Sequence, residues 1–493
     1  MHVPRKIQAR SLHASILSLL MLFVLAVPIR ADQPNVVMIV VDDMNDWVGC
    51  LGGHPDVKTP NIDKLASRGM LFSNAHCAAP VCNASRVATL TGMRPGSTGI
   101  YDNSARWHEA LPQLKSIPQH FKAHGYEVVG GGKVYHHMPG FNRMSDWNQY
   151  FPQRFEGHYQ DRLHRGLDVK DFHFPDGYPL NAIPNVKALI KPPKNPREFD
   201  WGPLDKSDLE TGDGKMVQWA IDYLKKPHDQ PFFLAAGIYR PHLPFYATRQ
   251  YFDLYPLESI RLPAINEDDL SDLPPTALKL AAQRREDYEL VVESGKYREL
   301  VQAYLASISF ADAMVGRIID ALDQSENAKN TIVVLWSDHG WHLGEKHHLH
   351  KFTLWERSTR IPFIVVAPEV TKPRSFCDQP VDMLDLFPTL NDLCKLPKVN
   401  GLSGYSITTL LRDPNQNWER PAITSHGQGN HAIRTKNWRY IRYADGGEEL
   451  YDHQSDPHEW DNLADQPKHR QLKSELAQWV PSADVKPAGK KKN

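Results

Sequence analysis

The chain has 493 residues with 57 basic and 58 acidic side chains, and its formal net charge of −1 leaves no basic surplus for binding nucleic acid or an anionic membrane surface. Its length is sufficient for a large hydrophobic core, so we expect a main domain followed by a smaller one. The five cysteines are an odd number, which leaves at least one of them outside any intramolecular disulfide.

The first 31 residues have the pattern of a secretory signal peptide. A basic segment over residues 5–10 precedes an apolar run over residues 16–29, and Ala26 and Ala31 are small residues suited to cleavage. The apolar run is too short for a comfortable membrane span, and we find no other spanning segment. We therefore predict a mature chain that begins near Asp32 and works outside the cytoplasm, either periplasmic or secreted, without stable membrane insertion.

Apolar runs alternate with helical patterns through most of the remaining chain. Helical periodicity is found, for example, over residues 59–68 and 304–322. Continuous apolar runs, which are typical of strands buried on both faces, lie at residues 35–41, 231–236, 331–336 and 361–367. This alternation predicts an α/β domain over residues 32–411, in which a large, mixed but mostly parallel sheet is sandwiched by helices.

The segment from about residue 150 to 213 has little periodicity. It is rich in Pro, His, Asp and aromatic residues. Irregular segments of this length are usually functional or disordered. We interpret this one as an insertion that shapes a substrate pocket, with a plain surface excursion as the alternative.

A different pattern begins near residue 412. Residues 437–443 alternate at strand period, and Asp445-Gly-Gly447 then turns the chain into a second strand. With a short helix near residues 471–479, this predicts a small antiparallel sheet plus helix over residues 412–480. The Lys-rich end, residues 481–493, is predicted to be a disordered basic tail.

Two of the predicted strands end in acidic residues. Asp42 and Asp43 follow the first strand, and Asp338 with His339 follows the strand at 331–336. Taken alone, each Asp is an ordinary turn or cap residue. Because functional groups in parallel sheets gather beyond the carboxyl ends of the strands, we expect three carboxylates to meet there, and such a cluster requires a cation. Oxygen-rich clusters favour Ca²⁺, with Mg²⁺ as the alternative.

The stretch His76-Cys-Ala-Ala-Pro-Val-Cys-Asn-Ala-Ser-Arg86 places two cysteines near an arginine. A helix begins close to Ser85, so Cys82 is expected at its N-terminus, where unpaired amides stabilise an anion. Arg86 adds a permanent cation one turn away. A thiol in this position is acidified and reactive, whereas a structural disulfide requires neither feature.

This stretch, with Leu90-Thr-Gly92 after it, resembles the signature of type I sulfatases, whose cysteine is oxidised to formylglycine. The segments that are most similar to the iduronate-2-sulfatase branch are Gly132-Lys-Val-Tyr-His136, Arg240-Pro-His-Leu-Pro-Phe245, and Ser337-Asp-His-Gly-Trp-His-Leu-Gly-Glu345 followed by Lys351. The resemblance implies an alkaline-phosphatase-like fold and hydrolysis of a sulfated sugar, such as a glycosaminoglycan or an algal polysaccharide. It also implies that a formylglycine-generating enzyme converts Cys82 during maturation.

The same resemblance implies two sets of site residues. The cation would be held by Asp42, Asp43, Cys82, Asp338 and His339. The catalytic set would be Cys82, Arg86, Lys133, His136, His242 and Lys351.

Within the catalytic set the resemblance implies separate roles. Arg86 and Lys133 would position the hydrated aldehyde that attacks sulfur, with Lys133 also binding the sulfate, and His136 would assist the nucleophile. His242 and Lys351 would bind the sulfate and protonate the leaving oxygen, because a sugar alkoxide leaves poorly without a proton.

Two other functions stay open at this point. A phosphonate or phosphate ester hydrolase of the same superfamily would use the same plan of metal and nucleophile. A secreted carbohydrate-binding protein without catalysis would use only the pocket. Turnover of matched aryl sulfates and phosphates separates the first of these from a sulfatase, and the presence of any turnover excludes the second.

Overall fold

The computed structural model describes residues 33–138, 140–151, 179–183 and 199–489. The predicted signal peptide and most of the predicted insertion at 150–213 lie outside the described residues. From Gln33 onward the chain forms one compact unit, so the boundary predicted near residue 412 stays a prediction. Among the described residues, no helix combines the length and the apolar character that a membrane span needs.

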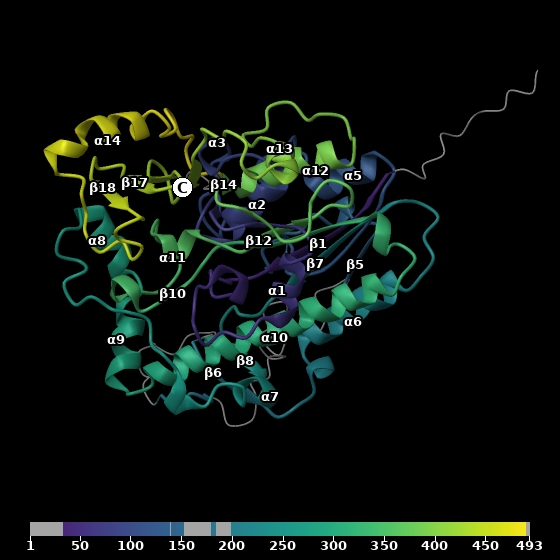
Figure 1. Cartoon of the computed structure of the whole chain (residues 1–493), viewed down its shortest axis with the longest axis horizontal. Coiled ribbons are helices and arrows are strands. Elements are labelled where there is room, and N and C mark those ends of the chain that lie inside the picture. Colours follow the sequence, from purple (N-terminus) through teal and green to yellow (C-terminus); the bar gives the residue numbers. More distant parts are fainter. Residues whose placement is uncertain (1–32, 139, 152–178, 184–198, 490–493) are drawn as a thin grey trace, which may run out of the picture. The chain divides into compact units, whose positions relative to one another are not determined.

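An eight-stranded sheet forms the centre of this unit (Figure 1). In spatial order its strands are β13 (Ser375–Cys377), β2 (Met70–Phe72), β12 (Phe363–Val366), β9 (Thr331–Ser337), β1 (Asn35–Val41), β7 (Phe232–Ile238), β4 (Glu127–Gly132) and β5 (Gln149–Phe151). The strands from β9 to β5 run parallel to one another, whereas β12 is antiparallel to both of its neighbours. The predicted mixed, mostly parallel sheet is therefore confirmed.

Helices cover both faces of the sheet because strands such as β1 bury apolar side chains on both sides. Val37, Ile39 and Val41 pack with α1 (Pro60–Ala66), α6 (Gly212–Leu224) and α10 (Tyr297–Asp323). The alternate residues Val36, Met38 and Val40 pack with α2 (Cys82–Thr91), α5 (Ile117–Ala123) and α12 (Leu386–Leu393). Figure 1 shows these two helical layers on opposite sides of the sheet.

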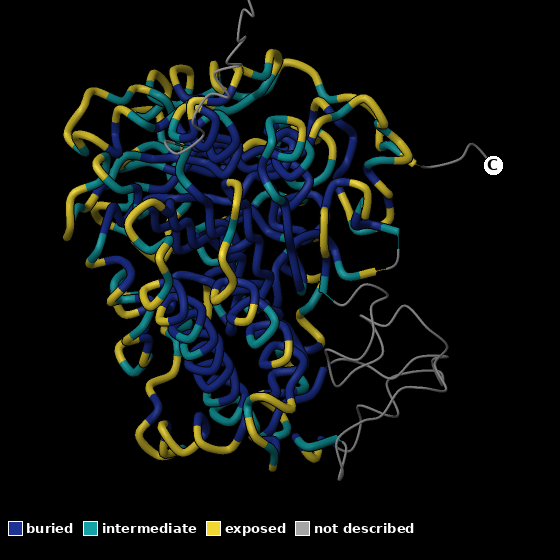
Figure 2. The backbone as a smooth tube through the Cα atoms, turned by 90° about the vertical axis from the view of Figure 1, so that its right-hand side faces the viewer, coloured by how far each residue is buried: buried dark blue, intermediate teal, exposed yellow. Residues whose placement is uncertain are grey.

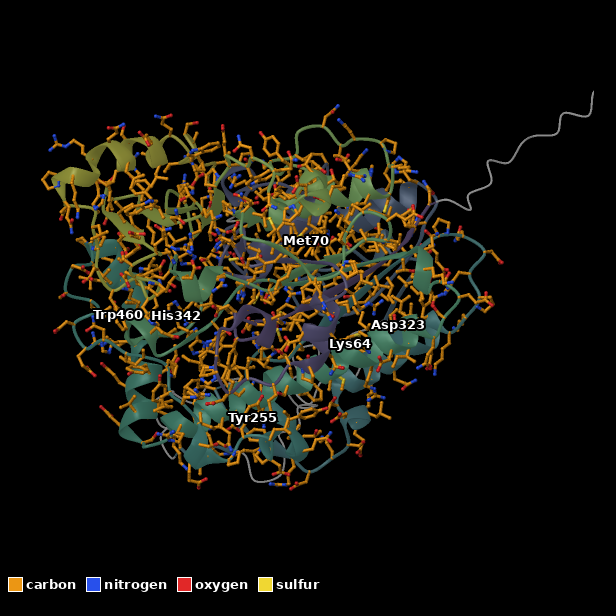
Figure 3. All side chains as sticks on the ribbon, in the orientation of Figure 1. Lys64, Met70, Tyr255, Asp323, His342 and Trp460 are labelled. Carbon is orange, nitrogen blue, oxygen red and sulfur yellow. The ribbon has the colours of Figure 1, made fainter. Side chains whose placement is uncertain are left out.

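Burial follows the same layering. β1, β7 and β9 are buried along their whole length, and exposed residues gather in loops and on the outer faces of helices (Figure 2). The outer surface is charged. Two ion pairs link α10 to α1 and to the turn after it. They are Lys64–Asp320 at 3.5 Å and Arg68–Asp323 at 2.9 Å, and Figure 3 labels Lys64 and Asp323.

The C-terminal part contains a four-stranded antiparallel sheet. Its strands are β15 (Ala422–Ser425), β16 (His431–Arg434), β17 (Trp438–Arg442) and β18 (Glu448–Asp452). The turn between β17 and β18 is the one that the sequence predicts, and α14 (Arg470–Ala477) packs on this sheet through Leu476. The small antiparallel sheet with one helix is thus confirmed.

The remaining helices and strands are short connections between these layers. They are β3 (Ala75–His76), α3 (Pro95–Thr98), α4 (Trp107–Ala110), β6 (Trp201–Leu204), β8 (Phe245–Thr248), α7 (Arg249–Phe252), α8 (Pro275–Ala282), α9 (Arg285–Glu293), β10 (His342–Leu343), β11 (Leu349–His350), α11 (Glu356–Thr359), β14 (Val381–Asp382) and α13 (Thr408–Arg412).

The structure describes the predicted tail as far as residue 489. Val485 N–H donates to the Gly96 carbonyl and Ala488 N–H to the Gly99 carbonyl, both at 2.8 Å. The Asp484 carboxylate lies 3.3 Å from His431 Nε2. Residues 481–489 therefore pack along α3 and β16, and residues 490–493 lie outside the described part.

Candidate active site

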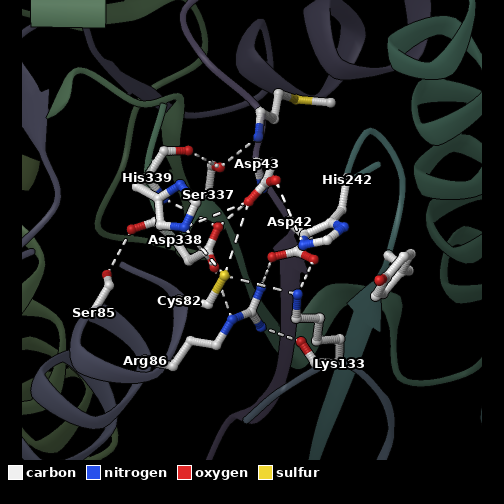
Figure 4. A network of polar contacts seen from close by, with 12 residues as sticks. Asp42, Asp43, Cys82, Ser85, Arg86, Lys133, His242, Ser337, Asp338 and His339 are labelled. Carbon is white, nitrogen blue, oxygen red and sulfur yellow. Dashed lines mark hydrogen bonds and ion pairs between the residues drawn. The ribbon is translucent and has the colours of Figure 1, made fainter. Parts of the chain in front are cut away.

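Four neighbouring parallel strands lead into seven of the predicted site residues at one edge of the sheet, whereas Cys82 and Arg86 lie in α2 and Lys351 follows β11. β1 leads into Asp42 and Asp43, and β9, beside it, leads into Asp338 and His339. β7 is followed by the loop that contains His242, and β4 by the segment with Lys133 and His136. Figure 4 shows the side chains from these strand ends converging around Cys82.

Asp42 is held between two cations. Its Oδ1 lies 2.8 Å from an Arg86 guanidinium nitrogen, and its Oδ2 accepts a short hydrogen bond from Lys133 Nζ. All three side chains are fully buried. Burial alone would raise the pKa of Asp42, but Lys133 and Arg86 hold that pKa well below its ordinary value. Asp42 is therefore ionised.

Asp338 shares the same arginine. Arg86 Nε donates to Asp338 Oδ2 at 2.9 Å, and the Ser85 hydroxyl donates to the Asp338 carbonyl at 2.5 Å. Both contacts come from the first five residues of α2, so the start of this helix is fixed against the end of β9. Burial raises the pKa of Asp338 to about 6, even though Arg86 and His339 act in the opposite direction.

Asp43 lies at the centre of the carboxylate cluster. Its backbone is in the left-handed region, with φ of 58°, and its N–H donates to Asp338 Oδ1 at 3.0 Å. Oδ1 accepts from Lys351 Nζ at 2.6 Å and lies 3.4 Å from His339 Nε2. Oδ2 lies 3.7 Å from His242 Nε2, is buried, and has no hydrogen-bond partner among the described residues. This oxygen is available to a ligand.

Cys82 is the first residue of α2, as the sequence predicts. Its sulfur lies 3.1 Å from Lys351 Nζ, 3.4 Å from His339 Nε2 and 3.9 Å from Lys133 Nζ. Burial alone would raise the pKa of this thiol, but Lys133, Lys351 and His339 hold it well below the ordinary value.

Cys77 gives a direct comparison. It is also buried, but burial and the nearby Asp338 raise the pKa of its thiol well above the ordinary value. The two sulfurs do not form a disulfide, and all five cysteines are free thiols. Of the two cysteines in the stretch 76–86, Cys82 is thus the one in an activating environment.

Glycines allow the strand ends to approach so closely. A Cβ on Gly237, in β7, would lie 2.2 Å from the carbonyl carbon of Lys133, and one on Gly132, where φ is 70°, would lie 2.0 Å from the Gly237 oxygen. Only residues without a side chain permit this contact. It places Lys133 beside Asp42 and lets the Lys133 carbonyl accept a hydrogen bond from Arg86.

The donor set fits a divalent cation. Asp43, Cys82, Asp338 and His339 each offer a ligand atom within 4.8 Å of the others, and Asp42, Asp43 and His242 form a second such group. The predicted ligand Asp42 thus shares a group with Asp43 and His242 rather than with Cys82. The unsatisfied Asp43 Oδ2, in a cluster of three carboxylates with the imidazoles of His242 and His339, suits a hard cation such as Ca²⁺ or Mg²⁺.

Cys82 opens into a pocket of about 380 Å³. Of the predicted catalytic residues, His136, His242 and Lys351 also line it, whereas Arg86 and Lys133 are buried and do not line it. Burial lowers the pKa of His136, and His136 Nδ1 has no hydrogen-bond partner among the described residues. The neighbouring His137, to which we assigned no role from the sequence, also lines the pocket and is half-buried.

Sequence reasoning missed most of the pocket wall. The residues that it did not identify are Asn103, Met138, Phe199, Leu243, Arg284, Asp287, Trp341, His350 and Phe352. Leu243 and Trp341 lie within matched motifs and Phe352 follows Lys351, so these motifs could have indicated all three residues. Arg284 and Asp287 belong to an ordinary charged stretch before and within α9, and nothing in their local sequence distinguishes them.

Comparison with known families gives two overlapping matches. The family described as "Sulfatase" matches residues 34–396, and the one described as "N-sulphoglucosamine sulphohydrolase, C-terminal" matches residues 344–485. A protein named "Sulfatase" from Formosa agariphila is 38% identical over 465 residues, which cover 92% of this chain and 88% of the relative. Iduronate 2-sulfatase from Homo sapiens is 35% identical over 354 residues, which cover 68% of this chain and 60% of the relative.

Solved structures share the fold. A 2-O GAG sulfatase superposes with a TM-score of 0.68 at 23% identity, covering 91% of both chains. The phosphonate monoester hydrolase of Agrobacterium radiobacter superposes with a TM-score of 0.71 at 19% identity, covering 90% of this chain and 94% of the other. At such identities the likeness establishes the fold alone, and it confirms the fold that the sequence predicts.

Proposed function

Because the chain belongs to the sulfatase family and is therefore a sulfuric ester hydrolase, we propose that it removes sulfate from a sulfated sugar at Cys82. The predicted similarity to the iduronate-2-sulfatase branch is confirmed by the 35% identity to the human enzyme, whose name denotes a sulfated uronic acid as substrate. The observation that carries the proposal is the acidified Cys82, buried among Lys133, Lys351 and His339 at the base of a pocket.

We propose that Cys82 matures to formylglycine and that Asp42, Asp43, Asp338 and His339 hold a divalent cation, Ca²⁺ or Mg²⁺, beside it. The hydrated aldehyde would supply the nucleophile, and the cation would supply positive charge. Maturation requires a formylglycine-generating enzyme. In keeping with its predicted signal peptide, the protein would act outside the cytoplasm.

The chain's own residues supply charge and protons. Lys133 and Arg86 keep Asp42 ionised and fix the base of the pocket. Lys351, 3.1 Å from the sulfur, neutralises charge on a bound sulfate. Lys351 and His242 lie on the pocket side of Cys82, where they can donate a proton to the leaving sugar oxygen.

His136 takes a separate role in this proposal. It lines the pocket, its ring is kept neutral by burial, and it interacts with Cys82. A neutral imidazole can accept a proton from the group at position 82. We assign His136 to assisting the nucleophile and its later deprotonation.

The first test is peptide mass spectrometry. The tryptic fragment 69–86 contains Cys77 and Cys82, and protein made together with a formylglycine-generating enzyme should show an aldehyde at Cys82 that traps a hydrazine. Cys77, whose pKa is raised, serves as the internal control and stays a thiol. An unmodified Cys82, in a culture that converts a reference sulfatase, contradicts the formylglycine mechanism.

The second test compares matched aryl esters and a panel of sulfated disaccharides. We expect 4-nitrophenyl sulfate to be hydrolysed faster than 4-nitrophenyl phosphate or a phenylphosphonate ester. Preference for the phosphorus ester identifies a phosphonate or phosphate ester hydrolase instead. Binding of a sulfated sugar without turnover of any ester, in fully converted protein, identifies a carbohydrate-binding protein.

A further inference from the structure

One cation at the rim of the pocket has no role in the reaction proposed above. Arg284, immediately before α9, lines the pocket with its side chain 41% exposed. Its closest carboxylate, on Asp287, lies 3.7 Å away, which is beyond hydrogen-bond distance. Among the described residues, the guanidinium therefore has no side-chain hydrogen-bond acceptor.

Asp287 attracts Arg284 by charge, but the Asp287 carboxylate forms its hydrogen bond with His350. The Asp287 carboxylate lies 3.1 Å from His350 Nε2, and both residues are buried in the pocket wall. The His350 ring packs against Trp341, with ring centroids 4.7 Å apart, and against Phe199 at 5.9 Å. Arg284 thus lies next to a wall of packed aromatic rings, and its donors remain available to a ligand.

The ring of Phe352 lies near both Arg284 and Lys351, and this limits the distance between Arg284 and the reaction centre. Arg284 Cζ lies 5.9 Å from the centroid of Phe352, and Lys351 Nζ lies 5.9 Å from the same centroid. The two cations can therefore be no further apart than twice that distance. Lys351 in turn lies 3.1 Å from the Cys82 sulfur. Phe352 thus lies beside both cations, and Trp341 lies beside Lys351, with its ring centroid 5.4 Å from Nζ. The other apolar residues that line the same pocket are Met138, Phe199 and Leu243.

This arrangement offers two anchors for anions on either side of an apolar platform. A sulfate at the base would occupy the anchor at Lys351, and a sugar ring would cover the platform. We propose that Arg284 is a specificity-determining residue that binds a second anionic group of the substrate, a carboxylate or a further sulfate. A guanidinium suits either group because its fork donates two parallel hydrogen bonds. This inference rests on the proposed function and narrows its substrate to sugars with two anionic substituents.

The test measures kcat and KM on two matched pairs of substrates. One pair is a glycosaminoglycan-type disaccharide with a 2-O-sulfated uronic acid, in its free-acid and carboxyl-reduced forms. The other is a galactose disaccharide with one or with two sulfates. The variants are Arg284→Ala, Arg284→Lys, and the control Arg285→Ala, which removes the neighbouring arginine that pairs with Glu289 outside the pocket.

We expect the unmodified enzyme to favour the doubly anionic member of at least one pair, and that pair identifies the second anion as carboxylate or sulfate. In Arg284→Ala this preference in kcat/KM should fall at least tenfold, mainly through KM. Arg284→Lys should keep part of it, and Arg285→Ala should keep all of it.

The inference would be overturned if kcat/KM were equal for the two substrates within both pairs. It would also be overturned if the preference for the doubly anionic substrate survived in Arg284→Ala. So would an equal loss on all four sugars and on 4-nitrophenyl sulfate, which indicates a structural role. If the enzyme hydrolyses 4-nitrophenyl sulfate but none of the sulfated sugars, the assignment of a sugar substrate is overturned together with this inference. Failure on every sulfate ester instead overturns the proposed function itself.

Discussion

The Lys351 ammonium contacts both groups on which the proposed reaction depends, the carboxylate of Asp43 and the sulfur of Cys82. Its ammonium lies 2.6 Å from Asp43 Oδ1 and 3.1 Å from the Cys82 sulfur, and it is buried. Burial would lower the pKa of Lys351, but Asp43 and Cys82 raise it above the ordinary value, so the side chain remains charged. A charged group at this position can both bind sulfate and donate a proton.

The substitution Lys351→Ala should separate these two contributions. We expect kcat/KM to fall about 10²–10⁴-fold on a sugar sulfate, because charge stabilisation and proton donation are both lost. On 4-nitrophenyl sulfate, whose leaving group needs no proton, the loss should be at least tenfold smaller. Steady-state kinetics on both esters provide the measurement, with Lys64→Ala on the surface of α1 as the control. Equal losses on the two esters would contradict a role in proton donation.

At the residue scale, the sequence predicted the carboxylate cluster, Cys82 and three residues of the pocket wall, but not the rest of that wall. Asp42, Asp43 and Asp338 could be placed together because strand ends in a parallel sheet meet at one edge. Cys82 and Arg86 could be placed from the start of a helix. Arg284 could not, since only tertiary packing brings the start of α9 over Phe352, and no local pattern encodes that contact. For the same reason, the sequence could not show that Asp42 groups with Asp43 and His242 rather than with Cys82.

Among the elements, the entry to α12 is formed by an unusual pair of carboxyl groups. Asp382 and Asp385 cap the 3₁₀ helix Met383–Asp385, which leads into α12 behind α2. Asp385 also accepts a hydrogen bond from the Tyr405 N–H at 2.7 Å. Burial and the nearby Asp382 raise the pKa of Asp385 to about 8. The folded protein therefore keeps a proton on this carboxyl group at neutral pH.

That proton makes stability depend on pH. Below the ordinary pKa of 3.8 the carboxyl group is protonated in both states. As pH rises from there to about 8, the unfolded chain loses the proton while the folded protein retains it, so the free energy of unfolding falls. Asp385→Asn removes this dependence and keeps an oxygen that can accept from Tyr405. We expect the variant to gain stability relative to the natural chain as pH rises from 4 to 8, by on the order of 1–3 kcal/mol.

Thermal unfolding at several pH values provides the measurement. The difference in melting temperature between Asp385→Asn and the natural chain should widen steadily toward pH 8. Asp413→Asn, which alters an exposed carboxyl group nearby, should follow the natural chain throughout. A constant difference across the pH range would mean that Asp385 is ionised in the folded protein.

Across the described part of the molecule, the C-terminal sheet supports the segment that leads to Cys82. The Ser425 N–H in β15 donates to the Ala78 carbonyl at 2.9 Å, and the Thr424 hydroxyl donates to the Cys77 carbonyl at 2.6 Å. The sheet was predictable from its alternating residues, whereas this attachment was not, because it joins backbone groups far apart in sequence. The attachment couples the position of Cys82 to the folding of the last part of the chain.

A buried charge network fixes the same sheet to the main body. Glu356 in α11 lies 3.2 Å from Arg434 Nε in β16 and accepts a short hydrogen bond from Arg439 in β17. Arg439 also lies 2.5 Å from Glu459 Oε1. Glu356, His453 and Glu459 lie close enough together to hold a metal, but the two arginines already neutralise both carboxylates. We therefore interpret the cluster as a structural ion network rather than a second metal site.

Removing one charge should reveal how far this network stabilises the molecule. Glu356→Gln leaves Arg434 and part of Arg439 buried without a counter-charge, so we expect the free energy of unfolding to fall by about 3–5 kcal/mol. Asp378→Asn breaks the exposed pair with Lys436 and should cost at most about 1 kcal/mol. Urea unfolding of both variants compares these costs. Because the sheet holds the segment before Cys82, Glu356→Gln should also lose sulfatase activity at urea concentrations where Asp378→Asn retains it. If the two variants unfold at the same urea concentration, the arginines are compensated by other groups and the network does not fix the sheet.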